Sequence, residues 1–443
     1  MKRTINLVAL LGLFVCSAQS PYEIIDAVNS ERIEIDIVKL VSFGTRHTMS
    51  ETKSDTRGIG AARRWIKSEF ERISDECSGC LEVSYQRTLE KGNSKTRITK
   101  DTEVVNVLAI KRGTRYPNRY VIMSADIDSR VSDALNYTDD SPGANDNASG
   151  MAGVIEAARV LSKYDFESSI LLVGLSGEEQ GLYGGKHLAA KAIDEGWNIV
   201  GVLNNDMIGN IEGVDGVVDN RTFRIFSEPT APTDSAFAIR LRRFYGGEVD
   251  GISRQLARYV YAMTKTYMPE MNPKMIYRLD RFGRGGHHRP FCDRGFAGIR
   301  IMEAHENYNR QHQDLREENG IKYGDVIEGV NFKYAKKLTA VNAIALAGLA
   351  AAPPQPQNVK IGGAVNPSTK LAWDKVDNPN LEGYKIYFRE TTSPTWDSYR
   401  LVDKNTTEYT LEGIVIDNYL FGVAAVGKNG FESLVVFPGE VMR

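Results

Sequence analysis

The sequence predicts an α/β protein: a three-layer sandwich with a mainly parallel central sheet, followed by a small all-β sandwich domain. Up to about residue 350, short and nearly continuous apolar runs alternate with helical stretches, which is typical of strands covered on both faces. Residues 351–357 are rich in alanine and proline and predict a semi-rigid linker. Residues 358–443 contain short alternating segments separated by turns, which predict the second domain.

The first 20 residues have the layout of a secretory signal peptide. Lys2 and Arg3 precede an apolar stretch at 7–15, and small residues follow it. The apolar stretch is roughly half of the ~20 residues that a membrane-spanning helix requires, so no membrane anchor is expected. Cys16 leaves a lipoprotein as an alternative. The expected localisation is secreted or periplasmic.

Within residues 21–350 the elements follow in a regular order. The segment 21–100 is polar and helix-rich, with apolar residues at helical spacing over 54–74. Further helices are predicted at 149–163 and 331–350, where apolar residues recur on one side. Buried strands are predicted for four runs: 119–125, 168–176, 198–206 and 296–303. In such sheets, sites form beyond the carboxyl ends of the strands.

The cysteines limit what the mature chain can form. Cys77 and Cys80 are close enough in sequence to form a local disulfide, and two unpaired thiols are the alternative. A zinc ribbon would need a second such pair, which the sequence lacks. Cys292 has no obvious partner and is expected to be buried.

The overall charge is close to neutral. The chain has 55 basic and 57 acidic side chains and a net charge of -2. Neither nucleic acid nor an anionic membrane surface is therefore expected as a partner. Local sites must carry the function.

Several acids and one histidine follow predicted strands or lie in nearby loops, where a reactive site is expected. They are Asp126, Asp128, Asp146, Glu178, Glu179, Asp206 and His312. Carboxylates gathered at strand ends repel one another strongly unless cations neutralise them, so divalent metals are implied. Of the adjacent Glu178 and Glu179, one can bind a metal while the other acts as general base on a water molecule. Each residue taken alone is more often a helix cap or a solvated turn.

These residues lie in segments that resemble the metal-site motifs of metallopeptidase family 28, the secreted di-zinc aminopeptidases. The segments are SADIDSR, PGANDNASG, LSGEEQGLYG, NNDMIG and HQD, with FGTRHT at 43–48. The resemblance implies a metallopeptidase domain over residues 21–350, with its metal-site motifs between residues 120 and 315. It implies that Asp146 bridges two metals and that Asp126 and Asp206 complete the first site. It also implies Glu179 and His312 as ligands of the second site, Glu178 as the general base and Asp128 as an orienting residue.

Asp126 departs from the family pattern, which has histidine at this position. An all-carboxylate first site is a harder ligand set, so manganese or magnesium becomes possible there beside the two zinc ions that the family implies. With four carboxylates and one histidine, the ligand charge would cancel that of two divalent ions, and the centre would be a weaker Lewis acid. In RGGHHRPF, where the family places an acid–histidine pair, His288 matches and His287 departs.

The expected function is that of an exported metallo-exopeptidase that removes N-terminal residues from peptides, with Glu178 as general base. One alternative is a non-catalytic binding protein on the same scaffold, with Asp126 marking a decayed site. The other is a glutaminyl cyclase-like enzyme with a single zinc. Residues 358–443 resemble a fibronectin type III domain, for which a polymer or a cell surface is a possible contact.

Overall fold

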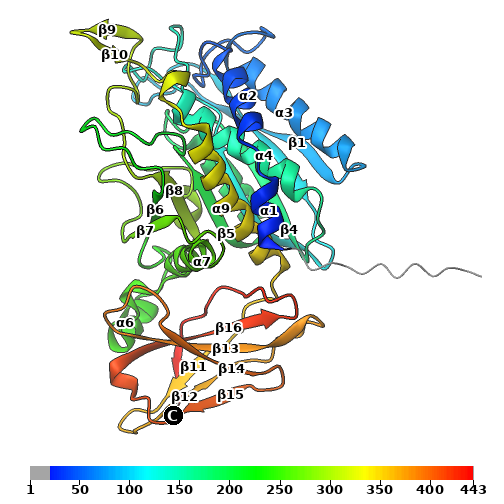
Figure 1. Cartoon of the computed structure of the whole chain (residues 1–443), viewed down its shortest axis with the longest axis vertical. Coiled ribbons are helices and arrows are strands. Elements are labelled where there is room, and N and C mark those ends of the chain that lie inside the picture. Colours follow the sequence, from blue (N-terminus) through cyan, green and yellow to red (C-terminus); the bar gives the residue numbers. More distant parts are fainter. Residues whose placement is uncertain (1–19, 443) are drawn as a thin grey trace, which may run out of the picture.

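The computed structural model describes residues 20–442. The larger part of the chain forms one sheet between two layers of helices (Figure 1). The helices are α1 (Pro21–Ala27), α2 (Ser30–Val41), α3 (Gly58–Glu76), α4 (Gly150–Leu161), α5 (Tyr183–Asp194), α6 (Ala236–Tyr245), α7 (Ile252–Tyr267), α8 (Arg289–Cys292) and α9 (Phe332–Ala351). The strands of this part are β1 (Leu81–Glu90), β2 (Thr102–Lys111), β3 (Tyr116–Asp126), β4 (Ser168–Leu175), β5 (Asn198–Asn205), β6 (Thr222–Ser227), β7 (Asn272–Ile276) and β8 (Gly298–Glu303), with a small ribbon of β9 (Arg316–Glu318) and β10 (Ile321–Tyr323).

The central sheet has eight strands in the order β1-β2-β4-β3-β5-β8-β6-β7. Strands β4, β3, β5 and β8 pair in parallel, as do β6 and β7. Strands β1, β2 and β6 join their inner neighbours in antiparallel orientation. The prediction of a mainly parallel sheet therefore holds for the four adjacent strands around the site, whereas the sheet as a whole is mixed.

Both faces of the inner strands are buried, which explains their continuous apolar runs. One face packs against α1, α2, α3, α4, α7 and α9, through residues such as Val121 and Met123 of β3. The other face packs against α5 and α8 through residues such as Tyr120 and Ile122 of the same strand. Successive residues of a strand point to opposite faces, so one apolar run supplies both cores. The expected three layers are present.

The four buried strands and the helices over 54–74, 149–163 and 331–350 agree with the prediction, within a few residues at their ends. The helix-rich reading of 21–100 is wrong from Leu81 onward, because β1 forms the edge of the sheet there. Its side chains alternate between half-buried and exposed positions, so the strand is polar in composition. Strands β2, β6 and β7 were not foreseen either.

The last part of the chain forms two further sheets, which lie below the α/β part in Figure 1. Their strands are β11 (Lys360–Gly362), β12 (Thr369–Ala372), β13 (Leu381–Glu390), β14 (Ser398–Asp403), β15 (Glu408–Leu411), β16 (Tyr419–Gly427) and β17 (Glu440–Val441). One sheet has the order β15-β12-β11-β17 and the other β14-β13-β16. A core that contains Trp373, Tyr384 and Phe421 lies between them.

This C-terminal unit is docked on the α/β part rather than tethered to it. Phe431 and Leu434 belong to the same apolar core as helix α9. Asp250 accepts hydrogen bonds from Arg258 of α7 (2.7 Å) and from Arg389 of β13 (2.7 Å), and all three side chains are buried. A continuous core and a buried ion cluster therefore join the two parts.

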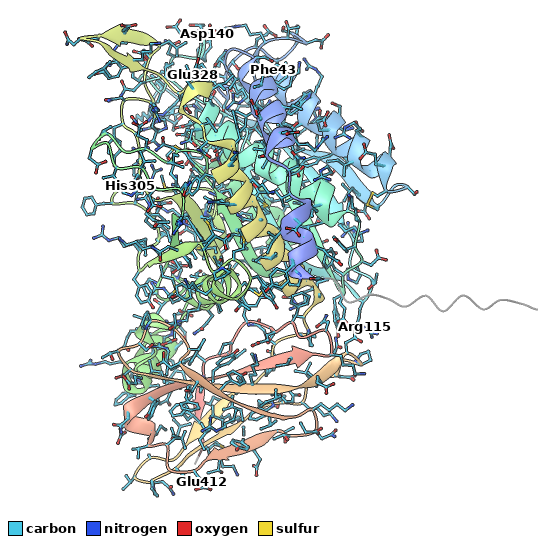
Figure 2. The ribbon with its side chains drawn as sticks, viewed as in Figure 1. Phe43, Arg115, Asp140, His305, Glu328 and Glu412 are labelled. Atoms are coloured by element: carbon cyan, nitrogen blue, oxygen red, sulfur yellow. A yellow bond between two sulfur atoms is a disulfide. The ribbon has the colours of Figure 1, made fainter. Side chains whose placement is uncertain are left out.

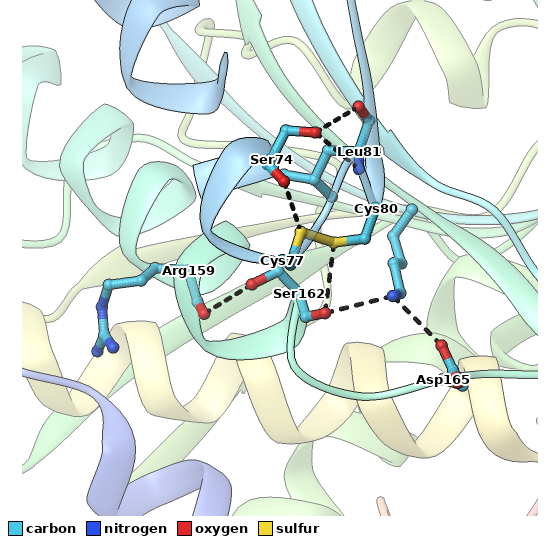
Figure 3. The surroundings of a disulfide bond; sticks show 8 residues. Ser74, Cys77, Cys80, Leu81, Arg159, Ser162 and Asp165 are labelled. Atoms are coloured by element: carbon cyan, nitrogen blue, oxygen red, sulfur yellow. Dashed lines mark hydrogen bonds and ion pairs between the residues drawn. A yellow bond between two sulfur atoms is a disulfide. The ribbon is translucent and has the colours of Figure 1, made fainter. Parts of the chain in front are cut away.

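Cys77 and Cys80 form a disulfide at the end of α3 (Figure 3). The alternative of two unpaired thiols is thereby excluded, and Cys292 is a buried free thiol as expected. The predicted signal peptide lies outside the described residues except for Ser20. Among the residues that the structure describes, no helix has the length and apolar character needed to cross a membrane.

Candidate metal centre

The site lies where parallel strands end side by side. Asp126 at the end of β3 is level with Leu175, the last residue of β4, and Ala125 is level with Asn205, the last residue of β5. The loops after these strands carry Glu178, Glu179 and Asp206. The expectation that strand ends would gather these acids is therefore confirmed by the register.

Asp146, Glu179 and His312 converge on one point. The His312 Nε2 atom lies 2.9 Å from Asp146 Oδ2 and 2.8 Å from Glu179 Oε1. One ligand atom from each residue lies within 4.8 Å of the other two. Within residues 20–442, this is the one group of three such side chains that could hold a metal ion.

The electrostatics of this cluster favour a cation. Burial lowers the pKa of His312, but Glu179 and Asp146 outweigh burial and raise it to about 9. Burial acts to raise the pKa of Asp146, but the hydrogen bond and charge of His312 bring it below the ordinary value. Positive charge is therefore stabilised between the two carboxylates. Two carboxylates and one imidazole also match the three protein ligands of a catalytic zinc site, which leaves a position open.

Arg130 supports the cluster from the outer side. Its Nε donates to Glu179 Oε2 (2.7 Å), and its Nη2 lies 2.7 Å from His312 Nδ1. One oxygen of Glu179 is thus held by the guanidinium, while the other faces Asp146 and His312. Arg130 is the last residue of the SADIDSR motif, but it was not among the predicted site residues.

The backbone around Asp146 is held by groups far away in the sequence. Asp325 accepts hydrogen bonds from the backbone N–H of Asn145 (2.9 Å) and of Asp146 (2.7 Å). Gly143 adopts a left-handed conformation (φ 53°), and a Cβ atom there would lie 2.5 Å from the Asp146 carbonyl oxygen. The buried Arg46 donates to the carbonyl of Gly143 (2.8 Å) and to that of Ile127 after β3 (2.9 Å). The FGTRHT segment therefore ties two loops of the site together.

Asp128 holds the segment that carries both glutamates. Its Oδ1 accepts from the N–H of Glu178 (3.2 Å), and its Oδ2 accepts from the N–H of Glu179 (3.0 Å). Gly177, with φ 77°, makes the turn that precedes them. Burial raises the pKa of Glu178 well above its ordinary value, and Glu179 and Asp206 add to this. Asp128 thus has the geometry of an orienting residue.

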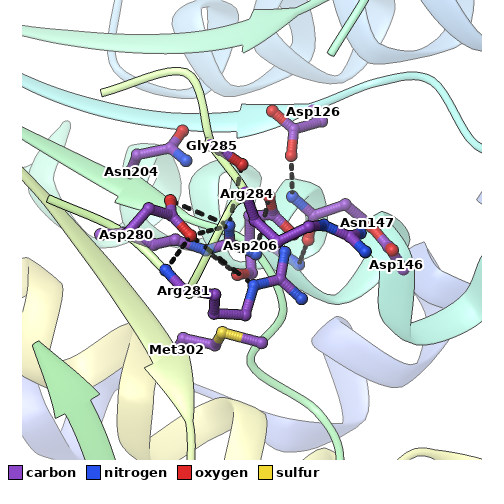
Figure 4. Close-up of polar contacts among 12 residues, drawn as sticks. Asp126, Asp146, Asn147, Asn204, Asp206, Asp280, Arg281, Arg284, Gly285 and Met302 are labelled. Carbon is purple, nitrogen blue, oxygen red and sulfur yellow. Dashed lines mark hydrogen bonds and ion pairs between the residues drawn. The ribbon is translucent and has the colours of Figure 1, made fainter. Parts of the chain in front are cut away.

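Asp126 is bound by protein groups rather than directed to the three-residue cluster. Its Oδ1 lies 2.5 Å from Nδ1 of His287, and its Oδ2 accepts from Asn147 Nδ2 (2.7 Å), as Figure 4 shows for Asn147. Both Asp126 and His287 are buried, and burial lowers the pKa of His287 to about 3. Burial, together with Asp206 and Glu178, also raises the pKa of Asp126 well above its ordinary value, so burial favours the neutral form of both groups in this contact. The two positions that depart from the family pattern are therefore partners in one buried hydrogen bond.

Asp206 is neutralised by a buried arginine. Its Oδ2 lies 3.0 Å from Nη2 of Arg300, which is fully buried and whose Nη1 donates to Asp280 (3.1 Å). Asp206, Asp280 and the neighbouring Arg281 are drawn together in Figure 4. The predicted first site of Asp126, Asp146 and Asp206 therefore does not present three free ligands, since two of its members have protein partners. The sequence could have pointed to Arg300, because it is a charged residue within an apolar strand.

The remaining histidines have roles in packing. His47 contacts the Ala134 carbonyl and Gln180, His187 pairs with Glu90, and His288 contacts the Leu279 carbonyl. His305 lies on the loop after β8, labelled in Figure 2. None of these four belongs to the three-residue cluster.

The cluster opens into a cavity of ≈650 Å³. Asp146, Glu178, Glu179, Asp206 and His312 all line it. Asp126 is not among the lining residues. Four of the five predicted metal ligands and the predicted base therefore face one common space, which can admit a small substrate.

Solved structures share the fold at low sequence identity. The LapA aminopeptidase of Legionella pneumophila matches with a TM-score of 0.53 at 17% identity, over 79% of this chain and 78% of that one. An aminopeptidase from Aneurinibacillus sp. strain AM-1 gives 0.53 at 14% identity, over 76% and 97%. A glutaminyl cyclase from Macrostomum lignano gives 0.51 at 14% identity, over 77% and 95%.

Sequence comparison gives much stronger matches. A probable zinc metalloprotease of Pyrenophora teres f. teres is 41% identical over 417 residues, 94% of this chain and 86% of that protein. A probable zinc metalloprotease of Leptosphaeria maculans is 41% identical over 415 residues, covering 94% and 95%. The model of Peptidase family M28 matches residues 106–326, which carry the five segments with the predicted metal-site residues but not FGTRHT at 43–48. This chain belongs to peptidase family M28.

Proposed function

We propose that this M28 peptidase is an exported, zinc-dependent exopeptidase that removes N-terminal residues from short peptides. One observation carries the proposal: Asp146, Glu179 and His312 converge, and Glu178 stands next to them in the same cavity. The names of the relatives support zinc as the metal. A cavity of ≈650 Å³ suits one or two residues at the end of a peptide rather than a long segment.

The geometry favours one ion rather than the two that the family resemblance implies. Asp146, Glu179 and His312 would hold it, and it would act as a Lewis acid toward the scissile carbonyl and its attacking water. Asp126 and Asp206 are paired with His287 and Arg300, and the described residues contain no second group of three converging ligand atoms. With no ligand set for a second ion, manganese or magnesium at Asp126 is not proposed.

Glu178 is proposed as the group that moves the proton. It takes a proton from the attacking water, the carbon–nitrogen bond breaks, and the proton passes to the leaving amine. The two N–H groups bound by Asp128 fix the backbone of the turn, so the Glu178 side chain is directed separately from that of Glu179. The raised pKa of Glu178 suits a group that both accepts and donates a proton.

Glu178→Gln tests the assignment. This variant should lose turnover of aminoacyl amide and dipeptide substrates by about 10²-fold or more, because general-base catalysis contributes about that much. Zinc content should stay at the wild-type level, since Glu178 is not among the three ligands. Glu179→Gln is the matched control, and it should lose both zinc and activity. Unchanged turnover in Glu178→Gln would refute the role of Glu178.

A glutaminyl cyclase-like reaction is the second candidate, because a single three-residue site also fits it. The products separate the two reactions. A peptidase releases a free amino acid, whereas cyclisation of an N-terminal glutamine releases ammonia and leaves the peptide bonds intact. If the zinc-loaded protein does neither, a non-catalytic binding role replaces both.

Export and the C-terminal unit belong to the same proposal. The Cys77–Cys80 disulfide supports an oxidising compartment, either outside the cell or in a periplasm. The two packed sheets of residues 358–443 support a fibronectin type III-like domain, with a polymer or a cell surface as its possible contact. Fractionation of cells that express the full chain checks the localisation.

A further inference from the structure

The rim of the cavity above the metal centre is strongly cationic. Six basic side chains line the cavity, namely Arg97, Arg130, Lys186, Arg281, Arg284 and Arg289. Leu182 and Pro290 are the two lining residues with sizeable apolar side chains. The whole chain has a net charge of -2, so this concentration of positive charge is local.

Four of the five carboxylates that line the cavity lie at its floor, and the fifth, Asp293, is exposed, whereas four of the six basic groups lie at its mouth. Asp146, Glu179 and Asp206 are buried, and each has a described partner at the floor. By contrast, Arg97, Lys186, Arg284 and Arg289 are exposed. A ligand that enters the cavity meets the basic groups first, and a bound divalent ion would add to the positive potential.

Three of the four exposed basic groups have no carboxylate partner among the described residues. Arg97 is anchored by a hydrogen bond from Nη1 to the Glu179 carbonyl oxygen (2.8 Å), which brings its guanidinium to the metal centre. Arg284 Nη2 lies 3.4 Å from His312 Nδ1. Lys186 lies over the ring of Tyr183 (5.0 Å). Arg289 has a longer contact to Asp293 (3.7 Å), and both side chains are half exposed.

An adjoining cavity of ≈690 Å³ is also lined by basic groups, and Phe226, Ile276, Phe282 and Tyr308 give it apolar walls as well. It shares Arg281, Arg284 and His312 with the first cavity and adds the exposed Arg278 and Phe282. Its carboxylate, Glu306, is held by Arg224 (2.9 Å) and Arg281 (2.7 Å). Positive charge thus extends away from the metal centre along both cavities.

We propose that the site selects peptides that carry a carboxylate within about one residue of the scissile bond, bound by Arg97 and Arg284. This inference rests on the proposed peptidase function and specifies its substrate class. Arginine binds carboxylates with two parallel charge-assisted hydrogen bonds, and a cationic mouth raises the association rate of anionic ligands. In the cavity above the metal centre, an apolar side chain would find only Leu182 and Pro290 as sizeable apolar partners. The carboxylate can be the C-terminal α-carboxylate of a dipeptide or the side chain of aspartate or glutamate.

Two matched substrate pairs test the proposal on the zinc-loaded full chain. One pair is Ala-Ala and Ala-Ala-amide, and the other is Ala-Asp-amide and Ala-Asn-amide. We expect kcat/KM to be at least tenfold higher for the charged member of one pair, and the difference to shrink in 0.5 M salt as charges are screened to a Debye length of about 4 Å. The pair that responds identifies the source of the carboxylate. Equal values within both pairs would overturn the proposal.

Variants identify the groups responsible. Arg97→Gln/Arg284→Gln should lose the preference for the charged substrates. Arg240→Gln/Arg243→Gln is the matched control, because it removes two exposed arginines of α6 that line neither cavity. If the first double variant does not fold, Arg284→Gln alone replaces it, since the contact of Arg284 to His312 is long. A preference that survives loss of these arginines would exclude them as the recognising groups.

Binding measurements test carboxylate recognition separately from peptidase activity. In zinc-loaded Glu178→Gln, calorimetric titration should give a Kd about tenfold lower for Ala-Ala than for Ala-Ala-amide, or for Ala-Asp-amide than for Ala-Asn-amide. If the charged peptides bind more tightly but the wild type hydrolyses none of the four, carboxylate recognition stands and the peptidase function falls. If the wild type hydrolyses all four peptides without preferring the charged ones, the peptidase function stands and the proposal of carboxylate recognition falls.

Discussion

At the scale of single residues, one contact links the two positions at which this chain departs from the family pattern. In the sequence, Asp126 and His287 look like two independent departures. In the structure, the two side chains are 2.5 Å apart and buried, so they form one acid–imidazole pair. The departures compensate one another. They do not by themselves mark a decayed site.

Restoring the family residue at position 126 alone should therefore be harmful. Asp126→His would place two imidazoles against each other in a buried pocket and leave the N–H of His287 without its acceptor. We expect a loss of about 1–3 kcal/mol in the free energy of unfolding, the usual cost of an unpaired buried polar group. Asp126→His/His287→Asp should recover most of it. Thermal unfolding of both variants measures this, and a double variant as unstable as the single one would contradict the pairing.

Asp36 gives a prediction of pH dependence away from the metal centre. Burial raises its pKa to about 7, with Glu69 and Glu156 adding to the effect and Arg32 and Arg72 opposing it. Folding thus favours the protonated form. Below about pH 4, ionisation of Asp36 does not affect the free energy of unfolding. As the pH rises from about 4 to about 7, ionisation lowers the free energy of unfolding, and above about pH 7 the loss stays constant.

The neutral isostere should remove this cost. Asp36→Asn is expected to stabilise the fold at pH 8 by on the order of 1–4 kcal/mol, at about 1.4 kcal/mol per pKa unit. It should change little at pH 4. Denaturant unfolding at the two pH values measures the difference, and Asp55→Asn serves as control because the Asp55 side chain is largely exposed (91%). A variant that is less stable at pH 8 would show that the charged form of Asp36 is well satisfied.

The sequence predicted the three side chains that converge, because each stands in a recognisable motif. It did not identify the residues that hold these three side chains in place. Asp325 and Arg130 act through pairings with segments about 180 residues away, and no local pattern marks such contacts. The metal role of Asp206 stays a prediction, and the length of chain between Asp206 and Arg300 hid their ion pair from the sequence.

At the scale of elements, the sequence predicted those strands whose two faces are buried. Continuous apolar runs are visible without any knowledge of the fold, and β3, β4, β5 and β8 have them. Strand β1 lies at an edge, and its residues are half exposed. Its polar composition resembles that of a surface helix. The positions of edge strands and antiparallel strands thus depend on tertiary contacts, and the sequence alone contained little sign that the sheet is mixed.

Helix α7 and strand β13 meet at Asp250, and that contact can be tested. Asp250→Asn would leave Arg258 and Arg389 buried beside a neutral side chain. Breaking a buried ion pair costs about 3–5 kcal/mol, so we expect a lower free energy of unfolding and earlier exposure of the C-terminal unit to protease. Asp377→Asn is the control, because Asp377 is exposed and no ion pair of Asp377 is found among the described residues. Equal stability of the two variants would exclude a structural role for the Asp250 cluster.

At the scale of the whole molecule, the C-terminal unit and the α/β part share a core, while the metal centre lies at the carboxyl end of the sheet. The three converging side chains come from loops that follow β3, β4 and β8, so a bound ion would join Asp146 and Glu179 to His312, which lies 133 residues after Glu179. Binding to the folded state alone stabilises it by about 2.7 kcal/mol when the free ligand is at 100 times its Kd. Zinc should therefore raise the unfolding temperature of the entire chain.

The number of zinc ions bound per chain gives the most direct test of the site. It shows whether only Asp146, Glu179 and His312 bind metal or whether Asp126 and Asp206 do so as well. We expect one zinc per chain by mass spectrometry of the dialysed protein. His312→Ala should abolish the zinc content and the thermal shift. Asp126→Asn should change neither, since its amide oxygen can still accept from His287. Two zinc ions in the wild type that fall to one in Asp126→Asn would mean that Asp126 leaves His287 for the metal, and the two-ion arrangement of the family would then apply to this chain.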